Sequence, residues 1–248
     1  MDNNSKKGSL NKKVSLSPTA SYGSPLTYKR EDGKEFHGYI VIPSFLLKQV
    51  EELDRNMSCN SLPTLILFHT AAGPRDIFLY WKADSLVTDK DLFPHSGSCV
   101  VFIADILSDG TGWAWDNNRS RYNQERDKVL STTIENGNPI RINLRSTISS
   151  AIETIQALPF VSTTKIAAMG WCLGGHSILE LGRMSRPNIH PLISYHGVFD
   201  PVSPEEFTFS NSAHNENTGI NNDTNSVLIC NGNKDPFVST ERFGKMSR

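Results

Sequence analysis

The sequence predicts an α/β fold in which a mostly parallel sheet carries helices on both faces. Three observations support this prediction: short apolar runs recur along the chain, polar or glycine-rich segments bound them, and helical patterns alternate with them. The runs span residues 64–68, 99–105, 165–170, 191–196 and 226–232. Strands that are apolar on both sides suit a parallel sheet that helices cover. Their alternation with helices is typical of a doubly wound sheet.

The remaining elements follow in chain order. Residues 35–43 ("EFHGYIVIP") alternate well enough for an early edge or hairpin strand. Residues 175–184 begin a helix directly after a group of glycines, and residues 141–158 carry apolar side chains near a helical period. These side chains are Ile142, Leu144, Ile148, Ala151, Ile152, Ile155 and Leu158. Polar stretches at 51–61, 106–138 and 205–225 predict long surface excursions.

The N-terminal segment differs in composition from the rest of the chain. Residues 1–24 are rich in serine, asparagine and lysine and hold almost no large apolar side chains. Such a segment cannot bury enough surface to offset the entropy of ordering it, so we expect a disordered tail. Residues 25–248 show no repeat and no second boundary, and they predict one domain.

Charge and composition exclude several classes of partner. The 248 residues include 25 basic and 26 acidic side chains, a formal net charge of −1. No strong field favours nucleic acid or an anionic membrane, so we expect a small-molecule partner. Four cysteines without metal-ligand spacing predict neither a metal site nor a disulfide framework, and they favour the cytoplasm. No cofactor is implied, and the oligomeric state stays open.

Residues 170–175 ("GWCLGG") join an apolar run to a predicted helix. The pattern glycine, any residue, nucleophile, any residue, glycine is the nucleophile elbow, in which a tight strand-to-helix turn presents one side chain in a strained, exposed position. A cysteine there gains from the N-terminus of the helix, which favours the thiolate. Cys172 is therefore a candidate nucleophile, against the alternative of an inert cysteine on a glycine-rich turn.

A second candidate feature, "FHTAAG" at 68–73, follows the first long apolar run. In this architecture the loop after that strand supplies one N–H group of the oxyanion hole, and the residue after the nucleophile supplies the other. The predicted donors are the main-chain N–H groups of Ala71 and Leu173. His69 lies at the strand end, and we interpret it as part of the hydrogen-bonded framework of the loop rather than as a base.

The third feature is "NGNKDPFV" at 231–238, after the last apolar run. An acidic residue at this place would hold a histidine in the right tautomer and stabilise its charged form. Asp235 fits this role, with a turn or helix-cap aspartate before Pro236 as the alternative.

Taken together, "HTAAG", "FIADIL", "KIAAMGWCLGGHSILEL", "ISYHGV" and "VLICNGNKDPFV" stand in the order and approximate spacing of the dienelactone hydrolase family. The chain resembles this family from about residue 33 to 240. The resemblance implies the α/β-hydrolase fold and a Cys-Asp-His triad. By position, Cys172 matches the nucleophile of the family, Asp235 the acid, and Ala71 and Leu173 the oxyanion donors.

The chain departs from the family pattern at two places. Many members carry a glutamate that helps to control the protonation of the thiol, and this chain has Thr70 there. The family histidine lies some thirty residues after the acid, whereas the last histidine here is His214, upstream of Asp235. We therefore expect a C-terminally truncated domain that lacks the triad histidine and the final helix.

Two other histidines are alternative bases. His196 follows a strand and could reach the site, and His176 lies near the start of the helix behind Cys172. Each also has an ordinary role available, as a strand-end polar group or as a packed helix residue. His37, His95, His190 and His214 are interpreted as surface or loop residues.

These observations predict a cysteine hydrolase of small esters or lactones, in which Cys172 attacks the carbonyl carbon. The alternative from another class is a catalytically inactive protein of the same fold that binds a ligand, which Thr70 and the missing base motivate. A serine hydrolase or acyltransferase is disfavoured, because the elbow holds Cys172 and Ser177 lies inside the predicted helix.

Overall fold

The computed structural model describes residues 23–46, 61–89, 91–108, 110, 112–135, 138–197, 227–232 and 235. Most of the predicted N-terminal tail lies outside these residues. The expectation that the final helix is missing concerns the C-terminal end of the domain, which also lies outside them. The first described strand begins at Gly23, two residues before the expected domain boundary.

The described residues form a seven-stranded sheet and a separate two-stranded hairpin. The order in the large sheet is β1-β2-β4-β3-β7-β8-β9. These strands span Gly23–Lys29 (β1), Glu35–Val41 (β2), Val100–Ala104 (β4), Leu62–Phe68 (β3), Val161–Trp171 (β7), Ile189–Tyr195 (β8) and Val227–Cys230 (β9). Strands β1 and β2 pair antiparallel at one edge, and the strands from β4 to β9 in this order are parallel.

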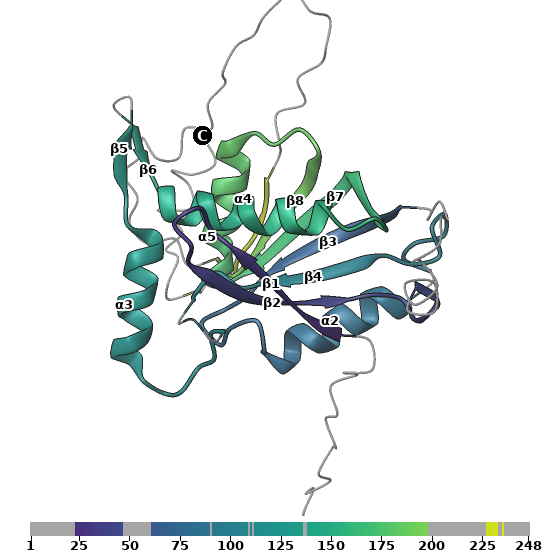
Figure 1. Ribbon diagram of the computed structural model, residues 1–248, viewed down its shortest axis with the longest axis horizontal. Helices are drawn as coiled ribbons and strands as arrows, with labels where there is room; N and C mark the ends of the chain where they lie inside the picture. Colours follow the sequence, from purple (N-terminus) through teal and green to yellow (C-terminus); the bar gives the residue numbers. More distant parts are fainter. Residues whose placement is uncertain are drawn as a thin grey trace, which may run out of the picture.

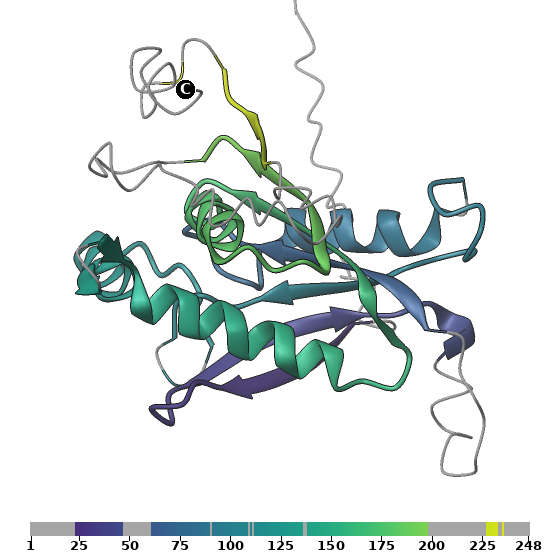
Figure 2. The same cartoon turned by 90° about the horizontal axis from the view of Figure 1, so that it is seen from above.

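Helices cover both faces of the sheet (Figures 1 and 2). Helix α2 (Ile77–Thr88) lies on one face, and α4 (Ile142–Gln156) and α5 (Gly174–Met184) lie on the other. Helix α3 (Arg119–Leu130) stands beside α4, and β5 (Thr133–Glu135) pairs with β6 (Asn138–Ile140) in the hairpin that follows it. The predicted α/β-hydrolase-like architecture is confirmed.

Burial explains why the apolar runs form the central strands. All residues of β4 are buried, and so are nearly all of β3, because helices pack on both sides of them. Helix α4 buries one stripe that includes Leu144, Ile148 and Ile155. Full burial of each such side chain contributes about 1.5–3 kcal/mol to folding. Among the described residues, no helix combines the length and the apolar character that crossing a bilayer requires.

The parallel strands bring four loops to one edge of the sheet. The chain leaves β3 at His69, β7 at Cys172, β8 at His196, and β9 shortly before Asp235. Because parallel strands share a direction, their carboxyl ends meet at this edge, where open α/β sheets bind ligands.

Candidate active site

Cys172 lies on the turn between β7 and α5 with a positive φ of 52°. This left-handed backbone is unfavourable for a residue with a side chain, so the turn is strained at the candidate nucleophile. The flanking glycines make the turn sterically accessible. A Cβ atom at Gly170 would collide with the carbonyl of Gly174, and one at Gly174 would collide with the carbonyl of Phe68. The structure therefore has the geometry of a nucleophile elbow at Cys172.

The predicted oxyanion donors surround the sulfur of Cys172. The main-chain N–H groups of Leu173 and Ala71 both act on this sulfur and lower the pKa of its thiol. Leu173 lies at the start of α5, and Ala71 lies in the loop after β3. Two N–H groups from separate elements thus converge on one point beside the thiol, as the stabilisation of an oxyanion requires.

The pKa of the Cys172 thiol is raised, and the largest cause is its partial burial. The main-chain N–H groups of Leu173 and Ala71 act in the opposite direction, because they favour the thiolate. Among charged groups, Asp235 raises this pKa further and Arg119 lowers it. The resting site therefore holds a thiol rather than a spontaneously formed thiolate, and a base must remove its proton before attack.

The loop that carries Ala71 is fixed by side chains around it. The hydroxyl oxygen of Thr70 accepts a hydrogen bond of 3.1 Å from the N–H of Ala72. The indole Nε1 of Trp113 donates to the carbonyl oxygen of Ala71 at 2.8 Å, and the N–H of Trp115 donates to the carbonyl oxygen of Ala72. Thr70 thus has a turn-forming role at the position where the family glutamate was expected.

His69 belongs to the framework of this edge, as the sequence predicted. Its ring is fully buried. Nδ1 donates to the carbonyl oxygen of Thr70 at 2.6 Å, and Nε2 accepts from the N–H of Ile106 at 2.9 Å. The carboxylate of Asp105 lies 3.2 Å from Nε2 and also accepts the N–H of Leu107. Both ring nitrogens are engaged away from Cys172, so His69 is not placed as a base.

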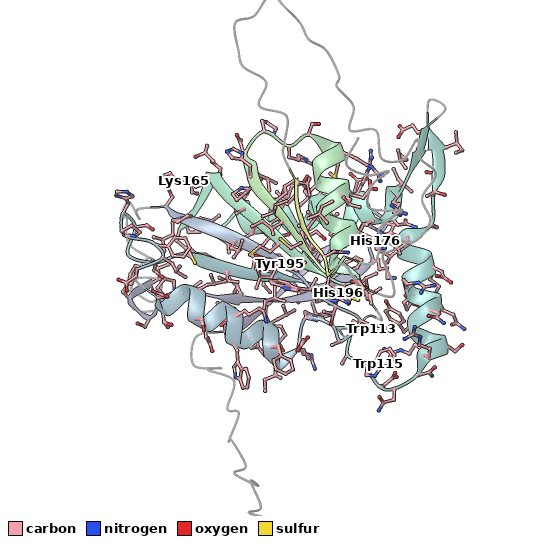
Figure 3. All side chains as sticks on the ribbon, turned by 180° about the vertical axis from the view of Figure 1, so that it is seen from behind. Trp113, Trp115, Lys165, His176, Tyr195 and His196 are labelled. Atoms are coloured by element: carbon pink, nitrogen blue, oxygen red, sulfur yellow. The ribbon has the colours of Figure 1, made fainter. Side chains whose placement is uncertain are left out.

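Asp235 and His196 are in direct contact, although 39 residues separate them in the chain. The carboxylate of Asp235 accepts a hydrogen bond from Nδ1 of His196. The Asp235 side chain is only 2% exposed, whereas the His196 ring is 53% exposed. Figure 3 shows His196 at the same end of the sheet as Trp113 and Trp115, and Lys165 toward the other end. Asp235 is therefore in contact with a histidine that precedes it in the chain, and not with one that follows it.

His176, the other alternative base, lies inside the protein. It is 1% exposed on α5, which packs against α4. Burial and the nearby cations Arg141, Arg183 and Arg126 hold its pKa well below the usual range. A buried imidazole that resists protonation cannot act as an acid–base group for Cys172.

Sequence reasoning did not find two contributors to the site. Arg119, in the first turn of α3, lowers the pKa of the Cys172 thiol through its positive charge. Trp113 bonds to the loop that carries Ala71, and it belongs to the segment 106–138 that was predicted to be a surface excursion. Trp113 is instead fully buried. A tryptophan inside a polar segment was a signal that this segment returns to the core. Within the described part of the chain, no three His, Cys, Asp or Glu side chains gather in a way that could hold a metal ion.

Comparison with known sequences identifies the family. The sequence pattern described as "Dienelactone hydrolase family" matches residues 95–248, which is more than half of the chain. The chain belongs to the dienelactone hydrolase family. A curated relative, "Uncharacterized protein K02A2.1" of Caenorhabditis elegans, is 28% identical over 98 residues. That match covers 39% of this chain and 53%, about half, of the relative.

Solved structures of dienelactone hydrolase-like proteins share the fold. A dienelactone hydrolase-like promiscuous phosphotriesterase, P91, from metagenomic libraries is 21% identical with a TM-score of 0.60, covering 91% of this chain and 75% of its own. The protein called m3DLH is 19% identical with a TM-score of 0.59 over 91% and 74% of the two chains. At these identities the likeness establishes the fold alone.

Proposed function

We propose that this member of the dienelactone hydrolase family is a cysteine-nucleophile hydrolase that acts on small esters or lactones. The observation that carries the proposal is the convergence of the N–H groups of Ala71 and Leu173 on the sulfur of Cys172. An acyl-transfer site needs a nucleophile and two donors around one reacting carbonyl, and this arrangement supplies all three.

In the proposed reaction, the sulfur of Cys172 attacks the carbonyl carbon of the substrate and forms a C–S bond. The carbonyl electron pair moves to the oxygen, where the N–H groups of Ala71 and Leu173 stabilise it. Collapse of this intermediate breaks the bond to the leaving alcohol, and water then hydrolyses the thioester. Asp235 orients the histidine that moves the protons. None of these steps requires a metal or an organic cofactor.

The chemistry also bears on where the protein works. Cys172 must stay reduced to act as a nucleophile, and the described cysteines Cys99, Cys172 and Cys230 are all free thiols. A reducing compartment such as the cytoplasm suits such a site. The substrate is proposed to be an uncharged or weakly charged small molecule, in keeping with the near-neutral charge of the chain.

The test is the turnover of an aryl ester such as p-nitrophenyl acetate by the full chain. Cys172→Ala is expected to abolish release of the phenol, and mass spectrometry of the wild type is expected to find the acyl group on Cys172. Cys230→Ser is the matched control, because it changes a half-buried thiol outside the elbow. A thiol alkylating reagent should inhibit, and an organophosphonate should not. Retention of most activity in Cys172→Ala would overturn the proposal.

One observation favours a second candidate function, a ligand-binding protein without turnover. The raised pKa of the Cys172 thiol makes it a weak nucleophile when no base assists it. This alternative predicts that an ester or a carboxylic acid binds with the same affinity to the wild type and to Cys172→Ala, and that neither protein accumulates an acyl group. Detection of an acyl-enzyme excludes it.

A further inference from the structure

A buried carboxylate, that of Asp105, directly follows β4 at the edge of the sheet that holds the candidate site. Its side chain is fully buried, and both oxygens accept main-chain hydrogen bonds. Oδ1 accepts the N–H of Leu107 at 3.0 Å. Oδ2 accepts the N–H of His37, on β2, at 3.3 Å and the N–H of Trp113 at 3.4 Å. Because a buried carboxylate is stable only with such partners, Asp105 fixes the main chain around it.

The first link from Asp105 to the loop that carries Ala71 runs through Trp113. The main-chain N–H of Trp113 bonds to Oδ2 of Asp105, and its indole Nε1 donates to the carbonyl oxygen of Ala71 at 2.8 Å. The same loop lies against the main chain of Trp113. A Cβ atom at Gly73 would be 2.4 Å from the carbonyl oxygen of Trp113, so the two segments approach as closely as a glycine permits. A displacement of Trp113 therefore displaces the segment that carries Ala71.

The second link runs through His69. The ring of His69 is fully buried, and its Nε2 lies 3.2 Å from Oδ1 of Asp105. On the other side of the ring, Nδ1 donates to the carbonyl oxygen of Thr70 at 2.6 Å. The hydroxyl oxygen of Thr70 in turn accepts the N–H of Ala72. The residues on either side of Ala71 are thus held by contacts that lead back to Asp105.

We propose that Asp105 is a positioning residue for the oxyanion donor at Ala71 and that it acts through Trp113 and His69. The catalytic part of this inference rests on the proposed function. The carboxylate of Asp105 holds two separate supports of one loop, so the N–H of Ala71 faces the sulfur of Cys172 in a fixed geometry before a substrate arrives. Electrostatic stabilisation of an oxyanion depends on donors that are held in place in this way.

The positioning role and the charge of Asp105 act on Cys172 in opposite directions. A nearby negative charge disfavours a thiolate, so loss of the charge alone should lower the pKa of the thiol. The N–H of Ala71 lowers this pKa, so loss of the loop geometry should raise it. The charged groups that act on the sulfur, Asp235 after β9 and Arg119 on α3, stay unchanged in this comparison. The direction of the shift therefore separates the two roles.

The experiment compares Asp105→Asn with the wild-type full chain. Asparagine keeps the size of the side chain, but its amide group cannot accept hydrogen bonds at both ends. Alkylation of Cys172 by iodoacetamide is followed by mass spectrometry from about pH 6 to 11, a range that brackets the pKa of thiols. The rate should reach half of its maximum at a higher pH in Asp105→Asn. A half-maximum at the wild-type pH or below would overturn the inference.

Tyr28→Phe is the matched control. The hydroxyl of Tyr28 donates to the main-chain carbonyl oxygen of Asp105, so this variant removes a buried hydrogen bond at the same residue and retains the carboxylate. It should lower the melting temperature and leave the alkylation profile of Cys172 unchanged. Equal shifts of the profile in Tyr28→Phe and Asp105→Asn would show that general loosening of the fold moves it, and they would overturn the inference.

Steady-state kinetics with p-nitrophenyl acetate test the catalytic part. Asp105→Asn is expected to lower kcat by about 10- to 100-fold with KM within about twofold, since the oxyanion forms only along the reaction path. If Cys172→Ala lacks turnover while Asp105→Asn has the wild-type kcat, only the inference fails. Turnover in Cys172→Ala removes the proposed function, and the alkylation profile, which needs no turnover, then decides whether Asp105 positions Ala71.

The two links can also be tested one at a time if Asp105→Asn does not fold. His69→Phe keeps a buried ring and removes both nitrogens, and Trp113→Phe removes the indole donor. Each variant should move the alkylation profile of Cys172 to higher pH, because each frees one side of the loop. A wild-type profile in either variant would overturn the inference.

Discussion

The indole Nε1 of Trp113 donates a hydrogen bond of 2.8 Å to the carbonyl oxygen of Ala71, whose own N–H is a proposed oxyanion donor. The contact crosses 42 residues of sequence, and the tryptophan is fully buried. A donor of this kind stabilises a transition state only when it is held in place before the reaction. Trp113 is thus a positioning residue for the candidate site.

Trp113→Phe is therefore expected to lower kcat for aryl esters by about 10-fold with little change in KM, because the oxyanion forms only along the reaction path. Phenylalanine retains most of the packing and removes the N–H donor. Trp115→Phe is the control, since Trp115 contacts this loop through its main-chain N–H and its indole bonds to Asn117. Steady-state kinetics measure kcat and KM for both variants. Equal kcat values in the two variants would contradict the assignment of Trp113 as a positioning residue.

The second prediction concerns the protonation of Cys172. Partial burial raises the pKa of its thiol, so the rate of alkylation by iodoacetamide should reach half of its maximum at a higher pH than in an unstructured peptide, where free cysteine titrates near pH 8.5. Arg119→Gln removes a cation that favours the thiolate and should shift the profile to still higher pH. Asp235→Asn removes an anion that disfavours the thiolate and should shift it to lower pH.

Quantification of the alkylated Cys172 peptide by mass spectrometry gives these profiles without interference from other thiols. Cys99 is an internal reference, because burial raises the pKa of its thiol to about 12. Added salt should shrink the effect of Arg119→Gln, since Arg119 is exposed to solvent. Shifts of the two variants in the same direction would show that their charges do not act on the sulfur.

The central strands and the elbow could be predicted from the sequence because their signals are local. Strands β3 and β4 are buried on both faces and read as continuous apolar runs. The glycines around Cys172 mark a turn in which Cβ atoms at Gly170 and Gly174 would collide with backbone. Such signals need no knowledge of distant residues.

Helix α2 was not predicted from the sequence, because its exposed aromatic residues obscure the helical period of its apolar side chains. It buries Leu79, Ala83 and Val87, four residues apart, while Phe78 and Trp81 face solvent and pack edge to face on each other. Because these two aromatic residues lie on the exposed face, the sequence of the helix shows little contrast between an apolar buried stripe and a polar exposed face. The aspartate that caps the helix, Asp76, was the remaining signal.

The histidine expected to pair with Asp235 was a triad histidine that the sequence as given lacks, and His196 was only an alternative base, so the contact between His196 and Asp235 was not predicted. His196 and Asp235 are 39 residues apart, and only the pairing of β8 with β9 brings them together. The same holds for Arg119, whose effect on Cys172 depends on where α3 begins. Contacts that depend on strand order and loop course have no signature in a local pattern.

The third prediction concerns a buried ion-pair cluster on the far side of the elbow helix. Glu180 of α5 is completely buried, and three arginines surround its carboxylate. Arg145 donates at 2.6 Å, Arg141 lies at 3.5 Å, and Arg183 lies one turn further along the same helix. Removing one member of such a buried pair leaves charge that nothing nearby compensates, at a cost of about 3–5 kcal/mol.

Glu180→Gln should therefore lower the free energy of unfolding by about 3 kcal/mol or more, as measured by urea denaturation with circular dichroism. Glu153→Gln on the exposed side of α4 makes the same chemical change and should alter that free energy by less than about 0.5 kcal/mol. Because α5 begins at the elbow, the loss of Glu180 should also reduce the fraction of correctly folded active site at physiological temperature. If both variants unfold at the same urea concentration as the wild type, the arginines are stabilised independently of Glu180.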